Sequence, residues 1–318
     1  MTDRLYLVAT SPRLPAGLLS WACWQVLRSA PVYAAADGPQ VAAVRASGVD
    51  VTVLVGDPAA QAAQLRDRAR DGGSAAWLAG PEGDEQFARA LGLRVAREGG
   101  AELELVHGSW DPPGAALLSA VAVMDRLRSP GGCPWDAEQT HDSLMPYLLE
   151  EAYEAYGALE DGDLSALEEE LGDVLLQVLF HARLAEELPE DERWSIDDVA
   201  AGLVAKLIRR HPHVFGDTAV SGAAEVHANW DAIKLAEKAR TSVTDGVPLS
   251  QPALTLAATL LHKADKAGLV VDLPTGDDLG ARLLALVSEA RAQGRDPEVE
   301  LRSVAREVRD RIIAAERA

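Results

Sequence analysis

Two pairs of acidic residues, spaced for neighbouring turns of a helix, are the side chains in this sequence best placed to do chemistry. Glu151 and Glu154 lie three residues apart in a segment with helical periodicity, and Glu170 and Asp173 repeat that spacing in the next segment. Residues three apart share one face of an α-helix. Each pair therefore presents two carboxylates on one face of its helix.

The helices that must position these pairs are predicted from the apolar residues around them. A helix over 143–159 and a second over 164–187 each carry an apolar stripe, with the carboxylates at its edge. The stripes consist of Leu144, Leu148, Ala152, Ala155 and Leu159 in the first helix, and Leu167, Leu171, Val174, Leu175, Val178 and Ala182 in the second. The four-residue segment 160–163 is short enough to fold the helices antiparallel, so the two pairs are expected to face each other.

Four carboxylates at the margin of an apolar core would repel one another and resist desolvation unless a cation neutralised them. Oxygen ligands favour Mg²⁺, or Mn²⁺ as a substitute, and a site without His or Cys disfavours zinc. Glu150 lies further round, towards the polar face, so Glu151 is the better ligand of these two neighbours. The structural alternative is a solvated surface, because such glutamate pairs are usually exposed and the chain has 50 acidic residues.

Basic and aromatic side chains that could hold a nucleotide lie near these helices in the sequence. A helix with a cap predicted at Ser195 and Asp198 ends in basic residues, and a further helix begins after Ser221. An aromatic ring can stack on a base, and cationic groups bind phosphate oxygens. Taken singly, such residues are also typical core anchors or complements of a helix dipole. The candidate substrate-binding residues are Tyr147, Lys206, Arg209, Arg210, Trp230 and Lys234.

The length of 318 residues favours two or three domains. Strands predicted at 5–9, 51–55, 75–79 and 102–106 alternate with helices at 16–29 and 59–70, which indicates an α/β domain whose sheet is at least partly parallel. Residues 110–114 are expected to form a linker, and the chain from 115 onward is expected to be helical.

The composition excludes several classes of protein. The net charge of −20 argues against a general nucleic-acid binder, although a metal and a local basic cluster could still hold an anionic small molecule. The two cysteines, Cys23 and Cys133, are too few for a disulfide framework. No signal peptide or membrane span is recognisable, so we expect a cytoplasmic protein with no membrane partner.

Five segments resemble the signature of MazG-type nucleoside triphosphate pyrophosphohydrolases, members of the all-α NTP pyrophosphatase superfamily. They are Gly132-Cys-Pro-Trp-Asp136, Gln139-Thr140, Leu149-Glu-Glu-Ala-Tyr-Glu154, Glu169 to Ala182, and Arg209-Arg-His-Pro-His-Val-Phe-Gly216. The resemblance covers about residues 115–240. It implies an all-α fold, usually dimeric or a higher homo-oligomer, in which Glu151, Glu154, Glu170 and Asp173 bind Mg²⁺. It also implies that the basic and aromatic candidates after residue 205 hold the nucleotide.

The reaction that this resemblance implies is hydrolysis of the α–β phosphoanhydride of NTPs to NMP and pyrophosphate, in housecleaning of the nucleotide pool. Glu150 and Glu169, adjacent to the implied ligands, are the candidate catalytic residues that would orient or deprotonate the attacking water. The functional alternative is a non-catalytic, nucleotide-binding regulatory protein.

Three domains are expected: an α/β domain over 1–110, a catalytic all-α domain over 115–240 and a degenerate second MazG-type helical segment over 250–318. Residues 170–183 align without gaps on 278–291, where Ala281 replaces Asp173, so the second copy is expected to be inactive. The first domain faintly resembles S-adenosylmethionine-dependent tetrapyrrole methylases through Val53-Leu-Val-Gly-Asp-Pro58. Residues 10–15 lack the expected glycine-rich loop, which counts against cofactor binding.

Overall fold

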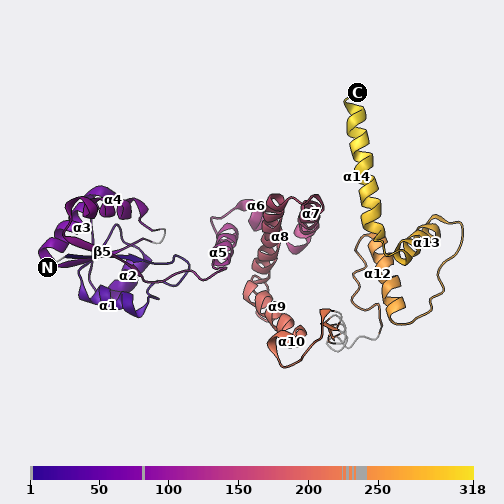
Figure 1. The fold of residues 1–318 in the computed structure, drawn as a ribbon, viewed down its shortest axis with the longest axis horizontal. Coiled ribbons are helices and arrows are strands. Elements are labelled where there is room, and N and C mark those ends of the chain that lie inside the picture. Colours follow the sequence, from indigo (N-terminus) through magenta and orange to yellow (C-terminus); the bar gives the residue numbers. More distant parts are fainter. Residues whose placement is uncertain (1–2, 81–82, 224, 227–228, 231–232, 234–241) are drawn as a thin grey trace. The chain divides into compact units, whose positions relative to one another are not determined.

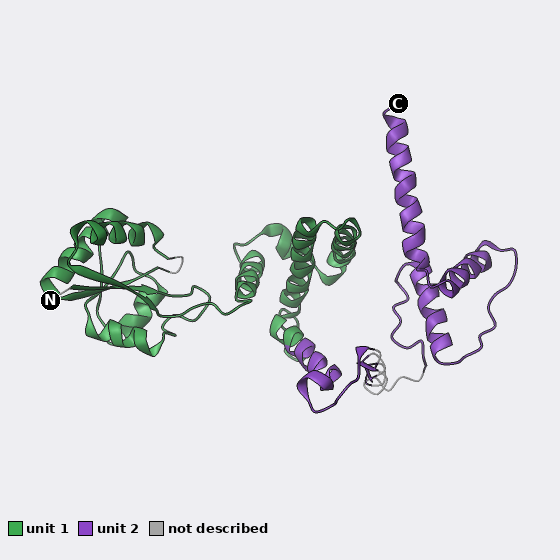
Figure 2. Cartoon of the chain, viewed as in Figure 1, with its two compact units in different colours: residues 1–200 green, residues 201–318 purple. Residues whose placement is uncertain are grey.

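The computed structural model describes residues 3–80, 83–223, 225–226, 229–230, 233 and 242–318 (Figure 1). The chain forms two compact units, residues 1–200 and 201–318 (Figure 2). No helix in the described ranges is long and apolar enough to cross a membrane. The predicted domain boundaries near residues 110 and 240 stay predictions.

A five-stranded parallel sheet forms the N-terminal part of the first unit (Figure 1). Its strands are β1 (Asp3–Ala9), β2 (Val32–Ala34), β3 (Val51–Val53), β4 (Ser74–Leu78) and β5 (Ala101–His107). They lie in the order β3-β2-β4-β1-β5, and every pairing between them is parallel. The predicted α/β character is therefore confirmed, and the sheet contains one short strand, β2, that the sequence pattern missed.

Four helices connect these strands and form a core on each face of the sheet. They are α1 (Trp21–Ser29), α2 (Pro39–Ala46), α3 (Pro58–Gly72) and α4 (Glu85–Glu98). One core contains Leu27 of α1 and Val44 of α2, and the other contains Leu65 of α3 and Phe87 of α4. The sequence pattern missed α2 and α4. It also began α1 too early, because the Ser20 side chain accepts a hydrogen bond from the Cys23 amide and fixes the start of the helix there.

The cysteines of the first unit are both free. Burial raises the pKa of the Cys23 thiol to about 11, so this thiol stays protonated and unreactive at neutral pH.

Helices complete the first unit, as the sequence predicted. They are α5 (Ala116–Arg128), α6 (Pro134–Glu138), α7 (His141–Asp161), α8 (Leu164–Ala185) and the beginning of α9 (Ile196–Arg210). Thr140 caps α7 through a capping box. Gly162 ends that helix with a left-handed backbone (φ 67°), and the Asp163 carboxylate accepts hydrogen bonds from the first amides of α8. Because only two residues separate the helices, α7 folds back and packs along α8.

The predicted cap at the start of α9 is also present. The Asp198 carboxylate accepts hydrogen bonds from the Ser195 amide at 2.8 Å and from the Ser195 hydroxyl at 2.9 Å. These hydrogen bonds lower the pKa of Asp198, because they stabilise the ionised carboxylate.

The second unit contains the end of α9 and four labelled helices: α10 (Pro212–Phe215), α12 (Ala253–Lys266), α13 (Leu279–Ala292) and α14 (Pro297–Glu316). The last three pack on one another. Asp278 caps α13, whereas its repeat partner Glu170 lies inside α8. The two copies of the repeat therefore occupy different positions in their helices.

Gly132, in the loop after α5, stands where no side chain fits. A Cβ atom there would lie 2.1 Å from the Leu127 carbonyl oxygen, which accepts a hydrogen bond from the Cys133 amide at 2.7 Å. We expect Gly132→Ala to lower the free energy of unfolding by about 2–4 kcal/mol, because the loop must move off α5. Denaturant unfolding measures this change.

Gly157→Ala is the matched control for that substitution. Gly157 lies in α7, and a Cβ added there meets no atom within 4 Å. Since alanine favours a helix over glycine, this variant should be at least as stable as the parent chain. Equal stability of Gly132→Ala and the parent would show that the loop tolerates a side chain.

Candidate metal centre

The carboxylates predicted as ligands come together between α7 and α8. One oxygen each of Glu151, Glu154 and Glu170 lie within 4.8 Å of one another. Asp173, one turn after Glu170, is close enough for its charge to act on both Glu151 and Glu170. The two-residue turn between the helices therefore brings both acidic pairs to one place.

The negative charges of these carboxylates repel one another. Desolvation by burial is the main cause that raises the pKa of the Glu151 and Glu170 carboxyls, and the negative charges of their neighbours raise it further. The neighbours are Asp173, Glu154 and Glu150 for Glu151, and Glu154, Asp173 and Glu169 for Glu170. A bound cation would therefore stabilise the ionised form of these carboxyls.

The donor set fits a hard divalent cation. All of its donors are carboxylate oxygens, which Mg²⁺ and Mn²⁺ prefer. Glu151 and Glu170 are half-buried while Glu154 is exposed, so one side of the cluster faces solvent and could admit water and a substrate. The residues present therefore fit the ion that the sequence suggested.

The raised pKa values of Glu151 and Glu170 predict that these two carboxyls contribute less to the stability of the metal-free chain as pH rises. Between the ordinary pKa of Glu170 and its raised value, the folded chain binds more protons than the unfolded chain, so the stabilisation present at acidic pH disappears as the carboxyl ionises. Glu170→Gln removes this charge. In EDTA, its gain in Tm over the parent should be larger at neutral pH than at acidic pH, as measured by thermal denaturation.

Glu168→Gln is the control for this pH series. Glu168 is exposed on the same helix and outside the carboxylate cluster, so its effect on Tm should vary less with pH. A Tm shift for Glu170→Gln that is the same at every pH would show that Glu170 has an ordinary pKa.

The two candidate catalytic residues border the cluster. Glu150 and Glu169 are exposed, and each lies next to a carboxyl whose pKa it raises. Both are thus near enough to act on groups at the cluster while keeping contact with solvent.

An aromatic group lies beside the first carboxylate pair. The Tyr147 ring, one turn before Glu151 on α7, meets Trp135 edge to face with ring centroids 6.1 Å apart. Trp135 also meets Phe180 edge to face at 6.4 Å, while half of its own surface stays exposed. Trp135 was not expected from the sequence as a site residue, although the Gly-Cys-Pro-Trp-Asp motif contains it.

The basic candidates lie in the second unit. Lys206, Arg209 and Arg210 belong to the last turns of α9. The Arg210 guanidinium lies 6.0 Å from the centre of the Trp230 ring, so these two candidates contact each other. Lys234 lies outside the described residues. The approach of these residues to the carboxylates stays a prediction.

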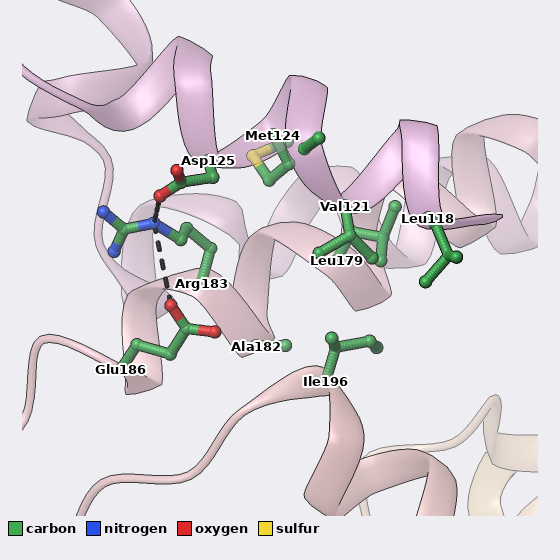
Figure 3. Close-up of a pocket in the computed structure, with 10 residues that line it drawn as sticks. Leu118, Val121, Met124, Asp125, Leu179, Ala182, Arg183, Glu186 and Ile196 are labelled. Atoms are coloured by element: carbon green, nitrogen blue, oxygen red, sulfur yellow. Dashed lines mark hydrogen bonds and ion pairs between the residues drawn. The ribbon is translucent and has the colours of Figure 1, made fainter. Parts of the chain in front are cut away.

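A cavity of about 300 Å³ lies on another face of α8, between α5 and the start of α9 (Figure 3). Apolar side chains such as Val121, Leu179 and Ile196 line it, and Arg183 pairs with Asp125 at 2.8 Å at its rim. Leu179 is nine residues from Glu170, half a turn away around the helix axis. This cavity is therefore separate from the carboxylate cluster.

The predicted apolar stripes are only partly buried within the chain. Leu144 and Ala155 of α7 are buried, but Leu148 and Leu159 are 41% and 61% exposed. On α8, Ala182 is buried while Leu171 is 54% exposed. Each predicted stripe is therefore buried only in part, because α7 and α8 cover only part of each other's apolar surface.

Comparison with known proteins identifies relatives of this chain. The family model of the MazG nucleotide pyrophosphohydrolase domain matches residues 139–215, which include all four carboxylates. An uncharacterized 26.1 kDa protein in the blaB 3′ region of Streptomyces cacaoi is 52% identical over 75% of this chain and 99% of its own length.

Two further relatives have names that state an activity. The nucleoside triphosphate pyrophosphohydrolase of Mycolicibacterium smegmatis is 46% identical over 67% of this chain, which spans 63% of that relative's length. The nucleoside triphosphate pyrophosphohydrolase/pyrophosphatase MazG of Thermotoga maritima is 37% identical over 62% of this chain and 84% of its own length. The chain therefore belongs to the MazG family of nucleoside triphosphate pyrophosphohydrolases, a family of hydrolases.

Proposed function

We propose that this chain hydrolyses nucleoside triphosphates between the α- and β-phosphates, with Mg²⁺ held by Glu151, Glu154, Glu170 and Asp173. The observation that carries the proposal is the meeting of three carboxylates within 4.8 Å, beside Asp173, inside the segment that matches the MazG domain. Without a cation, this cluster would repel a triphosphate.

The proposed reaction has a simple balance. The oxygen of a water molecule attacks the α-phosphorus, the bond to the bridging oxygen breaks, and pyrophosphate leaves with that oxygen. Bound Mg²⁺ would neutralise negative charge on the phosphate oxygens. Glu150 or Glu169, beside the ligands and open to solvent, would accept the proton of the attacking water.

The remaining candidates would hold the substrate. The exposed edges of Tyr147 and Trp135 offer apolar surface for a nucleobase near the carboxylates. Lys206, Arg209 and Arg210 would contact phosphate oxygens, and Trp230 would support Arg210 through its ring. A role in clearing unwanted nucleotides from the pool is part of this proposal.

We also propose that the chain works as a homodimer or a higher homo-oligomer. Large apolar side chains on α7 and α8 are exposed in the single chain, which is typical of a surface that another subunit covers. They are Leu148, Leu149, Leu159, Leu164 and Leu171. Light scattering during size-exclusion chromatography measures the mass, and a monomer at micromolar concentration would contradict the proposal.

Product identification tests the proposed reaction. A panel of canonical and modified NTPs is incubated with the chain and Mg²⁺, and the products are separated by ion-pair chromatography. We expect NMP and pyrophosphate in equal amounts. A nucleoside diphosphate with orthophosphate as the first products would contradict the proposal, and metal-dependent binding without turnover would favour a regulatory protein.

A further inference from the structure

A polar cavity of about 470 Å³ lies in the second unit, between α12, the end of α13 and the start of α14. These are the last three helices in Figure 1. Four basic side chains lie in its wall, and Asp296 is the acidic residue among those that line it. The basic residues are Lys263, Lys266, Arg291 and Arg295.

This concentration of cations stands out against the charge of the chain. Residues 201–318, the second unit, contain 16 acidic and 16 basic residues, although the whole chain has a net charge of −20. The second unit therefore carries its basic residues in balance with its acidic ones, and four of them gather at one cavity.

Lys263 places in the cavity wall a positive charge that no acidic residue of the described parts of the chain neutralises. Its side chain is half-buried, and within the described parts of the chain it forms no ion pair. Thr255 and Thr259, on the same face of α12, are also half-buried, and their hydroxyl groups make no hydrogen bond to any described residue. Because a positive charge in a cavity wall attracts anions when no counter-charge neutralises it, an anion in the cavity would pair with Lys263.

The two arginines of the cavity have N–H donors that their ion pairs do not use. Arg291 pairs with Asp265 through one terminal nitrogen at 2.9 Å, and Arg295 is held by Glu300. A guanidinium group has five N–H donors, so each pairing fixes the side chain and leaves further donors for a ligand. The Asp296 carboxylate already accepts hydrogen bonds from the Glu298 and Val299 amides at the start of α14.

We propose that this cavity is a binding site for a small molecule with two or more phosphate groups, such as pyrophosphate or a nucleotide. Several cations with fixed guanidinium groups suit the oxygens of a polyphosphate, and the volume lies within the usual range for small-molecule sites. A nucleic acid fits less well, because the surrounding unit is not basic overall. The proposal is independent of the reaction assigned to the first unit.

Calorimetric titration of the full chain with inorganic pyrophosphate, in EDTA, tests this site. The basic cavity needs no metal, so we expect one pyrophosphate to bind per chain at constant ionic strength. Lys263→Gln should weaken this binding by about tenfold, because it removes a charged donor. Far-UV circular dichroism confirms that the variant is folded.

Two control variants show whether pyrophosphate binds in this cavity or elsewhere on the chain. Arg311→Gln removes a positive charge from the exposed part of α14, where the Arg311 side chain is 80% exposed, and should leave the affinity unchanged. Glu151→Gln, in the carboxylate cluster, should also bind pyrophosphate as the parent does. Retained binding in both, with loss in Lys263→Gln, would establish the cavity as the site.

Three results would overturn the proposal. The first is no binding of pyrophosphate in EDTA, and the second is equal affinity of the parent and Lys263→Gln. The third is tighter binding of a duplex DNA than of pyrophosphate at the same ionic strength, which would show a surface for nucleic acid instead.

Discussion

Glu151→Gln is expected to lower the kcat/KM for NTP hydrolysis by about 10³-fold or more while the chain stays folded. Glutamine keeps the size of the side chain but removes the charge that would bind Mg²⁺. Glu151 is half-buried and close enough to Glu154 and Asp173 for their charges to act on it, so the variant loses one charged donor of the cluster.

Measuring the Tm of Glu151→Gln shows whether a loss of activity comes from the metal site or from unfolding of the chain. Removing one of several repelling charges should hold or raise the Tm of the metal-free variant, because Glu151 has its pKa raised in the folded chain. Glu168→Gln, a neutralised glutamate outside the cluster, should keep the activity of the parent. Activity of Glu151→Gln within about tenfold of the parent would remove Glu151 from the metal site.

The carboxylate cluster could be predicted from the sequence because helix geometry and one turn determine it. A spacing of three residues places Glu151 with Glu154 on one face, and Glu170 with Asp173 on another. The αL conformation of Gly162 and the cap from Asp163 then leave only two residues between the helices. Helix spacing and the short turn were therefore sufficient to predict that the two carboxylate pairs meet.

Burial was harder to predict, because it depends on which partner covers a helix. The sequence shows that Leu148, Leu159 and Leu171 lie on apolar stripes, but the single chain leaves them exposed. Conversely, Gln177 of α8 is buried although its polar side chain does not contribute to the apolar pattern. Periodicity identifies an apolar face, and only the packing of whole helices decides what covers it.

Short secondary-structure elements and contacts between distant residues could not be predicted from the sequence pattern either. β2 has three residues that are all buried, so no alternation of apolar and polar side chains marks it, whereas the equally short β3 lies in an apolar run that continues to Val55. The contact of Trp135 with Tyr147 joins a motif in α6 to a candidate in α7 that no spacing rule connects. The cavity of the second unit likewise depends on side chains from three helices.

Removal of divalent metal with EDTA is expected to abolish hydrolysis, and Mg²⁺ or Mn²⁺ should restore it. Metal should also raise the Tm, because an ion that binds the folded chain alone stabilises it by about 2.7 kcal/mol at 100 times its Kd. Since protons compete for the Glu151 and Glu170 carboxyls, whose pKa values are raised, this stabilisation should weaken as pH falls.

Glu151→Gln and Glu168→Gln make this metal experiment specific to the cluster. The gain in Tm on adding Mg²⁺ should nearly vanish in Glu151→Gln, which lacks a proposed ligand, and persist in Glu168→Gln. Equal gains in both variants would mean that Mg²⁺ stabilises the chain elsewhere, by screening its net charge of −20. Full hydrolysis in EDTA would exclude a metal from the reaction, and the carboxylates would then have to act on the substrate directly.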